Sequence, residues 1–334
     1  MKAWPTLGGF SCQASSRGSA LLLAMLTLGF VAAWSVYALN QQWRVVSVEA
    51  AEREGQQAQW LLVGALDWAR LVLREDARSS RIDHEGEPWA TPLREARLSG
   101  FLAASAEGVL TRNDAWVEQL FFSGRLIDLQ SRLNVTNLLG DKDIDPTARR
   151  AFARLYQTLQ LPEAELAHWT QRLWEAHHAK ADAQATLPPQ RLSQLTWLGL
   201  SRKSLNKLMP YITLLPERTQ VNLNTASVEV LSACVEGLTL ANAKAWVQAR
   251  DQQPFENIDS IQHRMGAAAQ SVTDPWHSVQ TRYFLATGTL RDQDREWVVQ
   301  AVMQREGMRV KTLWLDVSLS DTTQSCIRDQ GASC

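Results

Sequence analysis

The longest apolar stretch of the chain lies near its N-terminus. Residues 20–39 (ALLLAMLTLGFVAAWSVYAL) carry no charge, whereas residues 1–18 are mostly polar or small, with Lys2 and Arg17 as their only charges. At about 1.5 Å per residue, a helix of this length covers the ~30 Å hydrocarbon core of a bilayer. Positive charge before the stretch and little after it favours a cytoplasmic N-terminus. The pattern predicts a single membrane span over residues 19–44, with the rest of the chain outside.

A second helical pattern follows the span. Between residues 45 and 76 there is no proline, and apolar side chains recur at roughly 3.6-residue spacing: Trp60, Leu61, Val63, Leu66, Trp68, Leu71 and Leu73. This spacing predicts an amphipathic helix that packs one face on a core. Gly55 and Gly64 are the places where we expect it to bend or break. Residues 79–92 are rich in turn formers and predict a loop.

Strand-like alternation appears in two separate parts of the chain. The first part is Phe121–Val135, with Gly124 as a candidate bulge. The second part comprises residues 277–290, 296–306 and 308–319, with Glu306-Gly307 as a hairpin connection. Helical patterns occupy residues 137–261 between them. We therefore expect an α+β fold, in which a long N-terminal helix packs on an antiparallel sheet and the sheet is interrupted by an inserted all-α domain.

The predicted domains follow from these changes of pattern. They are a leader at 1–18, the span at 19–44, a first α/β part at 45–136, the helical insert at 137–274, the returning strands at 275–319 and a tail at 320–334.

Composition excludes some function classes. The chain has 334 residues, of which 45% are hydrophobic and 21% charged, as in a folded protein with a sizeable core. Its net charge of −1 argues against general binding of polyanions. No G-x-S-x-G, P-loop, G-x-G-x-x-G or H-E-x-x-H motif occurs, and His168, His177 and His178 fit a solvated helix face. We predict that the protein is not an enzyme.

The N-terminus allows different processing fates. Val31-Ala32-Ala33 could serve as a secretory cleavage site, and an uncut anchor is a further alternative. A lipoprotein signal fails because Cys12 precedes the apolar stretch. A polar leader that ends in Arg17-Gly18 and runs straight into apolar residues resembles the type IV prepilin signature. That resemblance implies cleavage between Gly18 and Ser19 by a prepilin peptidase, with methylation of the new amine.

The fifth residue after that cleavage site is unusual for a pilin. Most pilin-like subunits have glutamate there, which pairs with the N-terminal amine of a neighbour, whereas this chain has Leu23. A carboxylate in hydrocarbon costs several kcal/mol unless it is paired. Its absence resembles the K-type minor pseudopilin of type II secretion systems, the subunit at the filament tip.

Two internal stretches strengthen the resemblance to this family. Asp128–Val135 (DLQSRLNV) resembles its D-x-Q-x-R-F-N-L-N stretch, and Val221–Ser227 (VNLNTAS), with the helices after it and Pro254-Phe255, resembles its helical insert. The resemblance runs from Arg17 to about Leu319. It implies a minor pseudopilin that initiates and caps the pseudopilus and supports protein export across the outer membrane.

The resemblance also implies partners and a location. The partners are minor pseudopilins of the I and J types and then the H type, the prepilin peptidase and the inner-membrane assembly platform. The location is a single pass in the bacterial inner membrane, with the C-terminal domain in the periplasm. A minor pilin of a type IV pilus, and a membrane-anchored DNA receptor, are the alternatives.

Residues 221–261 also resemble the helix–hairpin–helix module of DNA receptors. In that module a Gly-x-Gly hairpin offers backbone amides to a phosphate, but the hairpin here is Glu236-Gly237-Leu238-Thr239. The segment carries two basic and five acidic residues, or 2 − 5 = −3. Because phosphate binding depends on basic residues, we predict a protein contact here and no nucleic acid.

Candidate metal and disulfide residues are few. Asp141, Asp143 and Asp145 alternate as in a calcium loop, and K-type pseudopilins are associated with calcium in their insert, so calcium is the one candidate cofactor. An N-cap role for Asp145 before Pro146 explains that residue equally well. Cys326 and Cys334 could form a disulfide in an oxidising periplasm or remain two thiols, and Cys234 is expected to be a buried free thiol.

Overall fold

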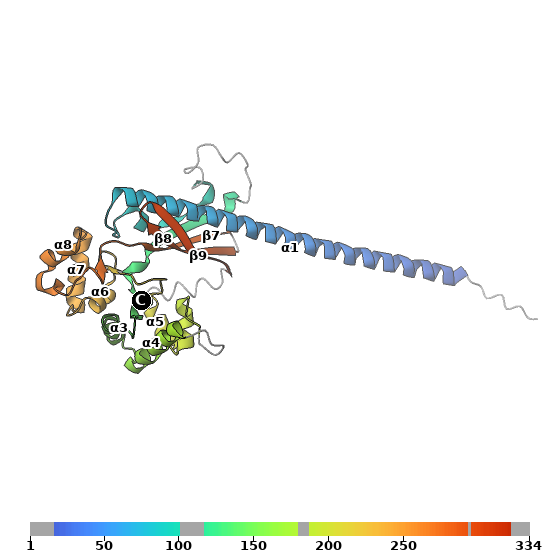
Figure 1. Ribbon diagram of the computed structural model, residues 1–334. Helices are drawn as coiled ribbons and strands as arrows, with labels where there is room; N and C mark the ends of the chain where they lie inside the picture. Colours follow the sequence, from blue (N-terminus) through green and yellow to red (C-terminus); the bar gives the residue numbers. More distant parts are fainter. Residues whose placement is uncertain (1–16, 101–116, 180–186, 293–294, 322–334) are drawn as a thin grey trace, which may run out of the picture. The chain divides into compact units, whose positions relative to one another are not determined.

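The computed structural model describes residues 17–100, 117–179, 187–292 and 295–321 (Figure 1). The chain divides into two units, Met1–Ala58 and Gln59–Cys334. One helix, α1 (Arg17–Ser79), makes up the described part of the first unit and continues into the second.

Helix α1 is continuous through both of its internal glycines after the apolar stretch, so the predicted break at Gly55 or Gly64 is wrong. Each glycine costs a helix only about 1 kcal/mol relative to alanine. Against this, Leu62 and Leu73 are completely buried and Leu66 is almost so. Burial of a leucine side chain contributes about 1.5–3 kcal/mol, and this outweighs the cost of the glycines.

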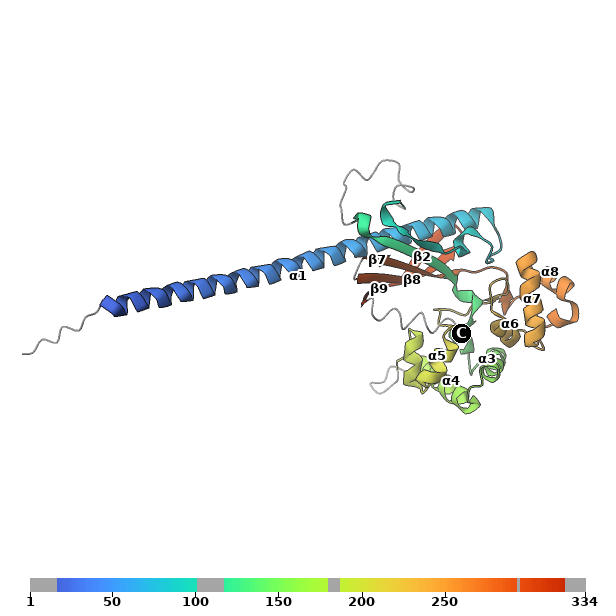
Figure 2. The ribbon, with the colours of Figure 1, turned by 180° about the vertical axis from the view of Figure 1, so that it is seen from behind.

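The second unit contains an antiparallel sheet of five strands in the order β1-β2-β7-β8-β9. The strands are β1 (Leu93–Arg97), β2 (Phe121–Asp128), β7 (Tyr283–Arg291), β8 (Arg295–Glu306) and β9 (Arg309–Asp321). Figure 2 shows the last turns of α1 lying along this sheet. The three predicted C-terminal strands are confirmed, with Gly307 at a φ of +57° in the hairpin between β8 and β9.

The first predicted strand is shorter than expected. Strand β2 ends at Asp128, whose side chain accepts from the backbone N–H of Gln130 and caps a 3₁₀ turn. The β2–β7 pair has no bulge at Gly124, which lies directly opposite Gly288, whereas the β1–β2 pair shifts its register beside Gly124, between Leu93 and Ala96 of β1. A Cβ on Gly124 would lie 3.3 Å from the Thr287 carbonyl oxygen, so close packing explains this glycine.

The α+β class with a helical insert is confirmed. The helices and turns between β2 and β7 are η3 (Leu129–Ser131), η4 (Val135–Leu138), α3 (Pro146–Thr158), α4 (Glu163–His178), η5 (Leu192–Leu198), α5 (Arg202–Leu208), α6 (Val228–Cys234), α7 (Leu240–Gln252), α8 (Ile258–Met265) and η6 (Gly266–Ala269). Two short parallel pairs accompany them: β3 (Leu133–Asn134) with β4 (Ile212–Thr213), and β5 (Val221–Asn222) with β6 (His277–Ser278). Buried apolar side chains from Leu133 to Val279 form one core under these helices.

Candidate functional site: an exposed apolar helix and a polar domain junction

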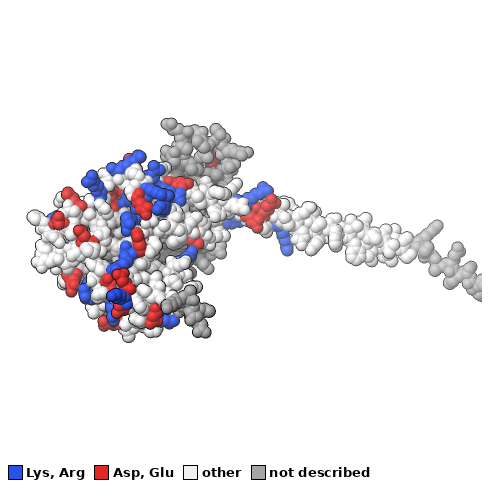
Figure 3. Space-filling model, viewed as in Figure 1, with Lys and Arg blue, Asp and Glu red and all other residues white. Residues whose placement is uncertain are grey.

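The N-terminal part of α1 exposes its apolar side chains. An 18-residue window of this helix has a mean hydropathy of 2.0 and buries none of its residues. Leu21, Leu22 and Leu23 are each about two-thirds exposed, and the helix is white along this stretch in Figure 3. Apolar exposure on this scale marks a surface that is covered by a membrane or by another protein. By length and composition, the helix fits a membrane anchor.

The Thr27 and Ser35 hydroxyls inside this stretch are satisfied within the helix. The Thr27 hydroxyl donates to the Ala24 carbonyl oxygen at 2.9 Å, and the Ser35 hydroxyl donates to that of Val31 at 2.8 Å. Hydrocarbon offers no hydrogen-bond partner, so such internal bonds are what a membrane helix requires. The Gly18–Ser19 peptide bond lies in the first turn of α1. Cleavage there remains a prediction.

The two stretches that carry the family resemblance meet at the junction of the sheet and the insert. Asp128, at the end of β2, is buried and accepts from Asn222 Nδ2 at 2.9 Å and from the Thr225 hydroxyl at 2.5 Å. Gln130 Nε2 donates to the Gln220 carbonyl oxygen at 3.0 Å. Burial raises the pKa of Asp128, and the hydrogen bonds from Thr225 and Asn222 oppose that rise. The junction is therefore a closed, buried polar network.

A second buried network ties the end of α1 to the sheet. The Arg305 guanidinium, on β8, donates to Asp76 Oδ2 at 2.6 Å, to a carboxylate oxygen of Asp83, and to the Thr281 carbonyl oxygen at 3.0 Å. Asp83 also accepts from the backbone N–H of Thr281 at 2.7 Å. Burial raises the pKa of Asp83 to about 6, although Arg305 opposes the rise.

This network includes the one group of carboxylates within the described ranges whose oxygens lie close enough to share a metal ion, namely Asp76, Asp83 and Glu87. Arg305 already neutralises Asp76 and Asp83, and Glu87 accepts from the Trp89 indole N–H at 2.7 Å. The arrangement therefore works as an ion-pair network. No sequence signal points to this network, because its members are far apart in the chain and belong to no motif.

The three predicted calcium ligands have different environments in the structure. Asp145 is the N-cap of α3 and accepts from the backbone N–H groups of Thr147 and Ala148. Its other oxygen pairs with Arg218 at 2.8 Å. Asp141 and Asp143 are exposed. In the part of the chain that is described, the three carboxylates do not converge, so calcium at this loop remains a prediction.

Of the four cysteines, one lies in the described part of the chain. Cys234 is a free thiol at the end of α6, and burial raises its pKa to about 12, which makes it unreactive at neutral pH. The predicted pairing of Cys326 with Cys334 falls outside the described residues.

In the helix–hairpin–helix segment, Arg250 and the hairpin residue Leu238 face inward, whereas Lys244, the other basic residue, is exposed. Arg250 is buried and donates to the carbonyl oxygens of Leu223 at 2.8 Å and Ala226 at 2.6 Å. Leu238, where a DNA-binding hairpin would have glycine, is buried and donates its amide to the Val235 carbonyl oxygen. Arg250 and Leu238 therefore stabilise the insert, and neither is presented to a phosphate.

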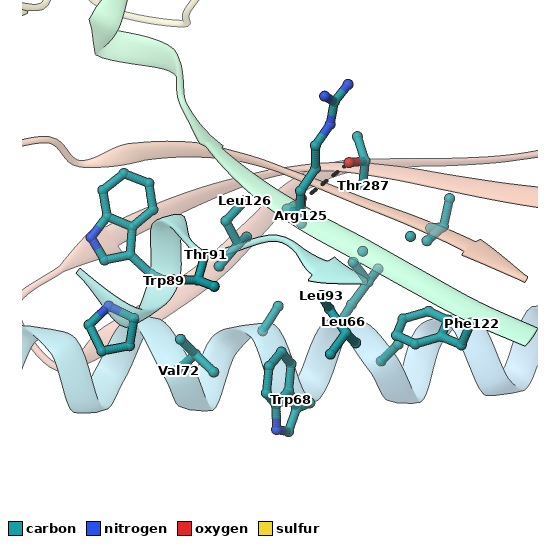
Figure 4. A pocket seen from close by; sticks show the side chains of 17 residues that line it. Leu66, Trp68, Val72, Trp89, Thr91, Leu93, Phe122, Arg125, Leu126 and Thr287 are labelled. Carbon is teal, nitrogen blue, oxygen red and sulfur yellow. Dashed lines mark hydrogen bonds between the residues drawn. The ribbon is translucent and has the colours of Figure 1, made fainter. Parts of the chain in front are cut away.

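A small apolar cavity of about 50 Å³ lies between α1 and the sheet. Figure 4 shows Leu66 and Val72 of α1 and Phe122 of β2 around it, while Arg125 points away from the helix. The paired glycines 124 and 288 line the cavity opposite α1, under the Phe122 ring. It has room for a few waters at most, and we interpret it as a packing feature.

Comparison with known proteins points to one family. Two family models, both described as "Type II secretion system (T2SS), protein K", match residues 131–217 and 221–280. The type II secretion system protein K of Pseudomonas aeruginosa is 26% identical over 317 residues, covering 86% of this chain and 89% of that protein. The protein K of Klebsiella pneumoniae is 25% identical over 320 residues, and the alignment covers 87% of this chain and 93% of that protein.

A solved structure shares the fold. A chain from the crystal structure of the GspK–GspI–GspJ complex of the enterotoxigenic Escherichia coli type 2 secretion system aligns with a TM-score of 0.59 at 20% identity. The alignment covers 81% of this chain and 99% of that chain.

Proposed function

We propose that the chain is a minor pseudopilin of the protein K family of type II secretion systems, and that it initiates the pseudopilus and remains at its tip. Its role is to assemble with other subunits, and it has no catalytic role. The observation that carries the proposal is the exposed apolar half of α1, which has Leu23 where pilin-like subunits usually have glutamate.

The tip position follows from the chemistry of that helix. A glutamate at position 23 would be stable in the membrane only if the amine of a subunit ahead paired with it. Leu23 needs no such partner, so a subunit with leucine here suits the end of the filament. The helical insert adds bulk that is fixed to the sheet by the buried Asp128 network, and a bulky, rigid head is accommodated better at an end than between stacked subunits.

Processing precedes assembly in this proposal. A prepilin peptidase cuts between Gly18 and Ser19 and methylates the new amine, and α1 holds the mature subunit in the inner membrane with its C-terminal domain in the periplasm. The apolar length of α1 and the position of that bond in its first turn support this order.

The proposed partners are I-type and J-type minor pseudopilins, followed by an H-type subunit and the inner-membrane assembly platform. A protein of the same fold, at 20% identity, has been solved in a complex named GspK–GspI–GspJ. The alternatives draw less support. The matched family models and relatives all carry the description of a type II secretion protein, which disfavours a type IV pilin. The inward-facing Arg250 argues against a DNA receptor.

Co-purification tests the proposal. The full chain, extracted from membranes that also contain the I-type and J-type subunits of its own secretion system, should elute with both as one complex. The same extraction without the J-type subunit shows whether the I-type subunit binds alone. Elution of the chain by itself in both cases, or a loss of surface pili without a loss of secretion on deletion, would overturn the proposal.

A further inference from the structure

A groove runs between α1 and the hairpin that joins β8 to β9. Its cavity volume is about 580 Å³, and it is lined by Asp67, Arg70, Leu71, Arg74, Met308, Arg309 and Val310. All of these residues belong to the second unit, so the groove lies within one part of the chain. Leu71 is 57% exposed and Met308 is 40% exposed, so apolar side chains face solvent from both walls.

The groove is positively charged. Arg70 is held by Asp67 and by the Thr312 hydroxyl, to which it donates at 2.7 Å. The side chains of Arg74 and Arg309 are exposed and have no hydrogen bond or ion pair with any described residue. The Glu306 side chain, which pairs with Lys311, lies near Arg309. The lining carries three arginines and one aspartate, or 3 − 1 = +2, on a chain whose net charge is −1. Figure 3 shows basic and acidic side chains interleaved over the rest of the visible head.

Strand β9 starts at the groove and carries further exposed apolar side chains away from it. It is an edge strand, paired with β8 alone in the described sheet. Its register places Leu315, Val317 and Leu319 opposite Ala301, Val299 and Trp297, which are buried on the α1 side of the sheet. These three β9 side chains therefore face the same side as α1. Leu315 is nevertheless 42% exposed and Leu319 is 60% exposed.

The facing side of α1 has the spacing of a helix–helix contact. Trp60, Gly64, Asp67, Leu71 and Arg74 follow one another at intervals of four, three, four and three residues, which places them on one face. Trp60 is 76% exposed, and a Cβ on Gly64 would touch nothing within 4 Å. An exposed tryptophan beside bare backbone allows another helix to approach closely.

We propose that the groove between α1 and β9 binds an acidic amphipathic helix of another pseudopilin subunit. The apolar side of that helix packs on Leu71, Met308 and the β9 side chains, and its carboxylates pair with Arg74 and Arg309. From Val310 to Leu319 the strand spans about 30 Å at ~3.3 Å per residue, the length of a helix of about 20 residues. A surface of that length exceeds a lipid headgroup, which favours a protein partner. This inference rests on the proposed function.

Photo-crosslinking in the full chain tests the inference. A photoreactive amino acid replaces Leu71, or Met308 in a second variant, in cells that contain the complete set of pseudopilins. We expect a cross-link whose mass-spectrometric assignment lies on an acidic helix of another pseudopilin. The double variant Arg74→Glu/Arg309→Glu should reduce the yield at least about tenfold, because it replaces two attractive charge pairs by repulsive ones.

A matched control separates charge at the groove from charge in general. Arg202→Glu/Lys203→Glu reverses two exposed charges on α5 of the insert and should leave the yield unchanged. An equal yield in the groove variant, no protein cross-link from either position, or cross-links to lipid alone would overturn the inference. If the wild-type chain still co-purifies with the I-type and J-type subunits in that case, the proposed function stands and only the assignment of this groove fails.

Discussion

Asn222 Nδ2 donates to Asp128 Oδ2 at 2.9 Å, inside the junction between the helical insert and the sheet. The two residues are 94 positions apart, and each belongs to a stretch that resembles the protein K family. The structure thus explains why these stretches have polar residues at buried positions. They complete one another's hydrogen bonds where the insert leaves the sheet.

Removal of the Asp128 carboxylate should destabilise the junction. Asp128→Ala leaves the buried donors of Asn222, Thr225 and Gln130 without their acceptor, so we expect the free energy of unfolding to fall by about 3 kcal/mol. Urea unfolding of the detergent-solubilised chain, followed by tryptophan fluorescence, measures this loss. Asp141→Ala, in an exposed loop, is the control and should change stability by less than about 0.5 kcal/mol. Equal effects of the two variants would contradict the role of Asp128.

The stability of the head should depend on pH through Asp83. Burial raises the pKa of this carboxyl to about 6 from an ordinary value of 3.8, so the folded state binds the proton more tightly than the unfolded state does. Protonated Asp83 therefore contributes to the free energy of unfolding below pH ~4. This contribution, roughly 3 kcal/mol, is lost as the pH rises to about 6. Burial also raises the pKa of Asp76 and Asp128, so their contribution to stability likewise decreases as the pH rises.

The comparison with Asp83→Asn isolates this contribution, because other groups titrate in the same range. His277, for example, has a pKa lowered by burial, which has the opposite effect on stability. We expect the unfolding free energy of the wild type, minus that of the variant, to decrease from pH 4 to pH 6.5. A difference that increases over this range would show that Asp83 is ionised and stabilising in the folded state.

Calcium should bind at the 141–145 loop only if the Asp145 carboxylate can coordinate the ion in addition to its present partners. Asp145 already caps α3 and pairs with Arg218. If the predicted site forms, Arg218→Gln should strengthen calcium binding in isothermal titration calorimetry, whereas Asp141→Asn/Asp143→Asn should abolish it. Calcium binding that survives the double substitution would place the ion elsewhere.

The sequence predicted most of the architecture because its signals are local. The apolar stretch at 20–39, the alternation in the strands after Trp276 and the turn at Gly307 each depend on neighbouring residues. The helix through Gly55 and Gly64 was predicted less well, because tertiary burial of Leu62 and Leu73 outweighs the low helix propensity of glycine.

The parts of the site that depend on distant residues could not be predicted. Arg305 lies 229 positions from Asp76, and no spacing rule connects them. The groove between α1 and the β8–β9 hairpin also depends on the register between β9 and β8, which decides the β9 side chains that face α1. The sequence singles out Asp128 and Asn222 only because each belongs to a stretch that resembles the same family. Their direct contact was visible only in the structure.

The intact mass and N-terminal sequence of the membrane-extracted chain test the central claim most directly. The chain should be expressed with and without its prepilin peptidase, with Gly18→Leu as the control that blocks the cleavage site. We predict a chain that begins at a methylated Ser19 only when the peptidase is present and Gly18 is intact. A chain that remains uncut in the presence of the peptidase, or one that begins near Trp34, would contradict its assignment as a processed subunit of the pseudopilus.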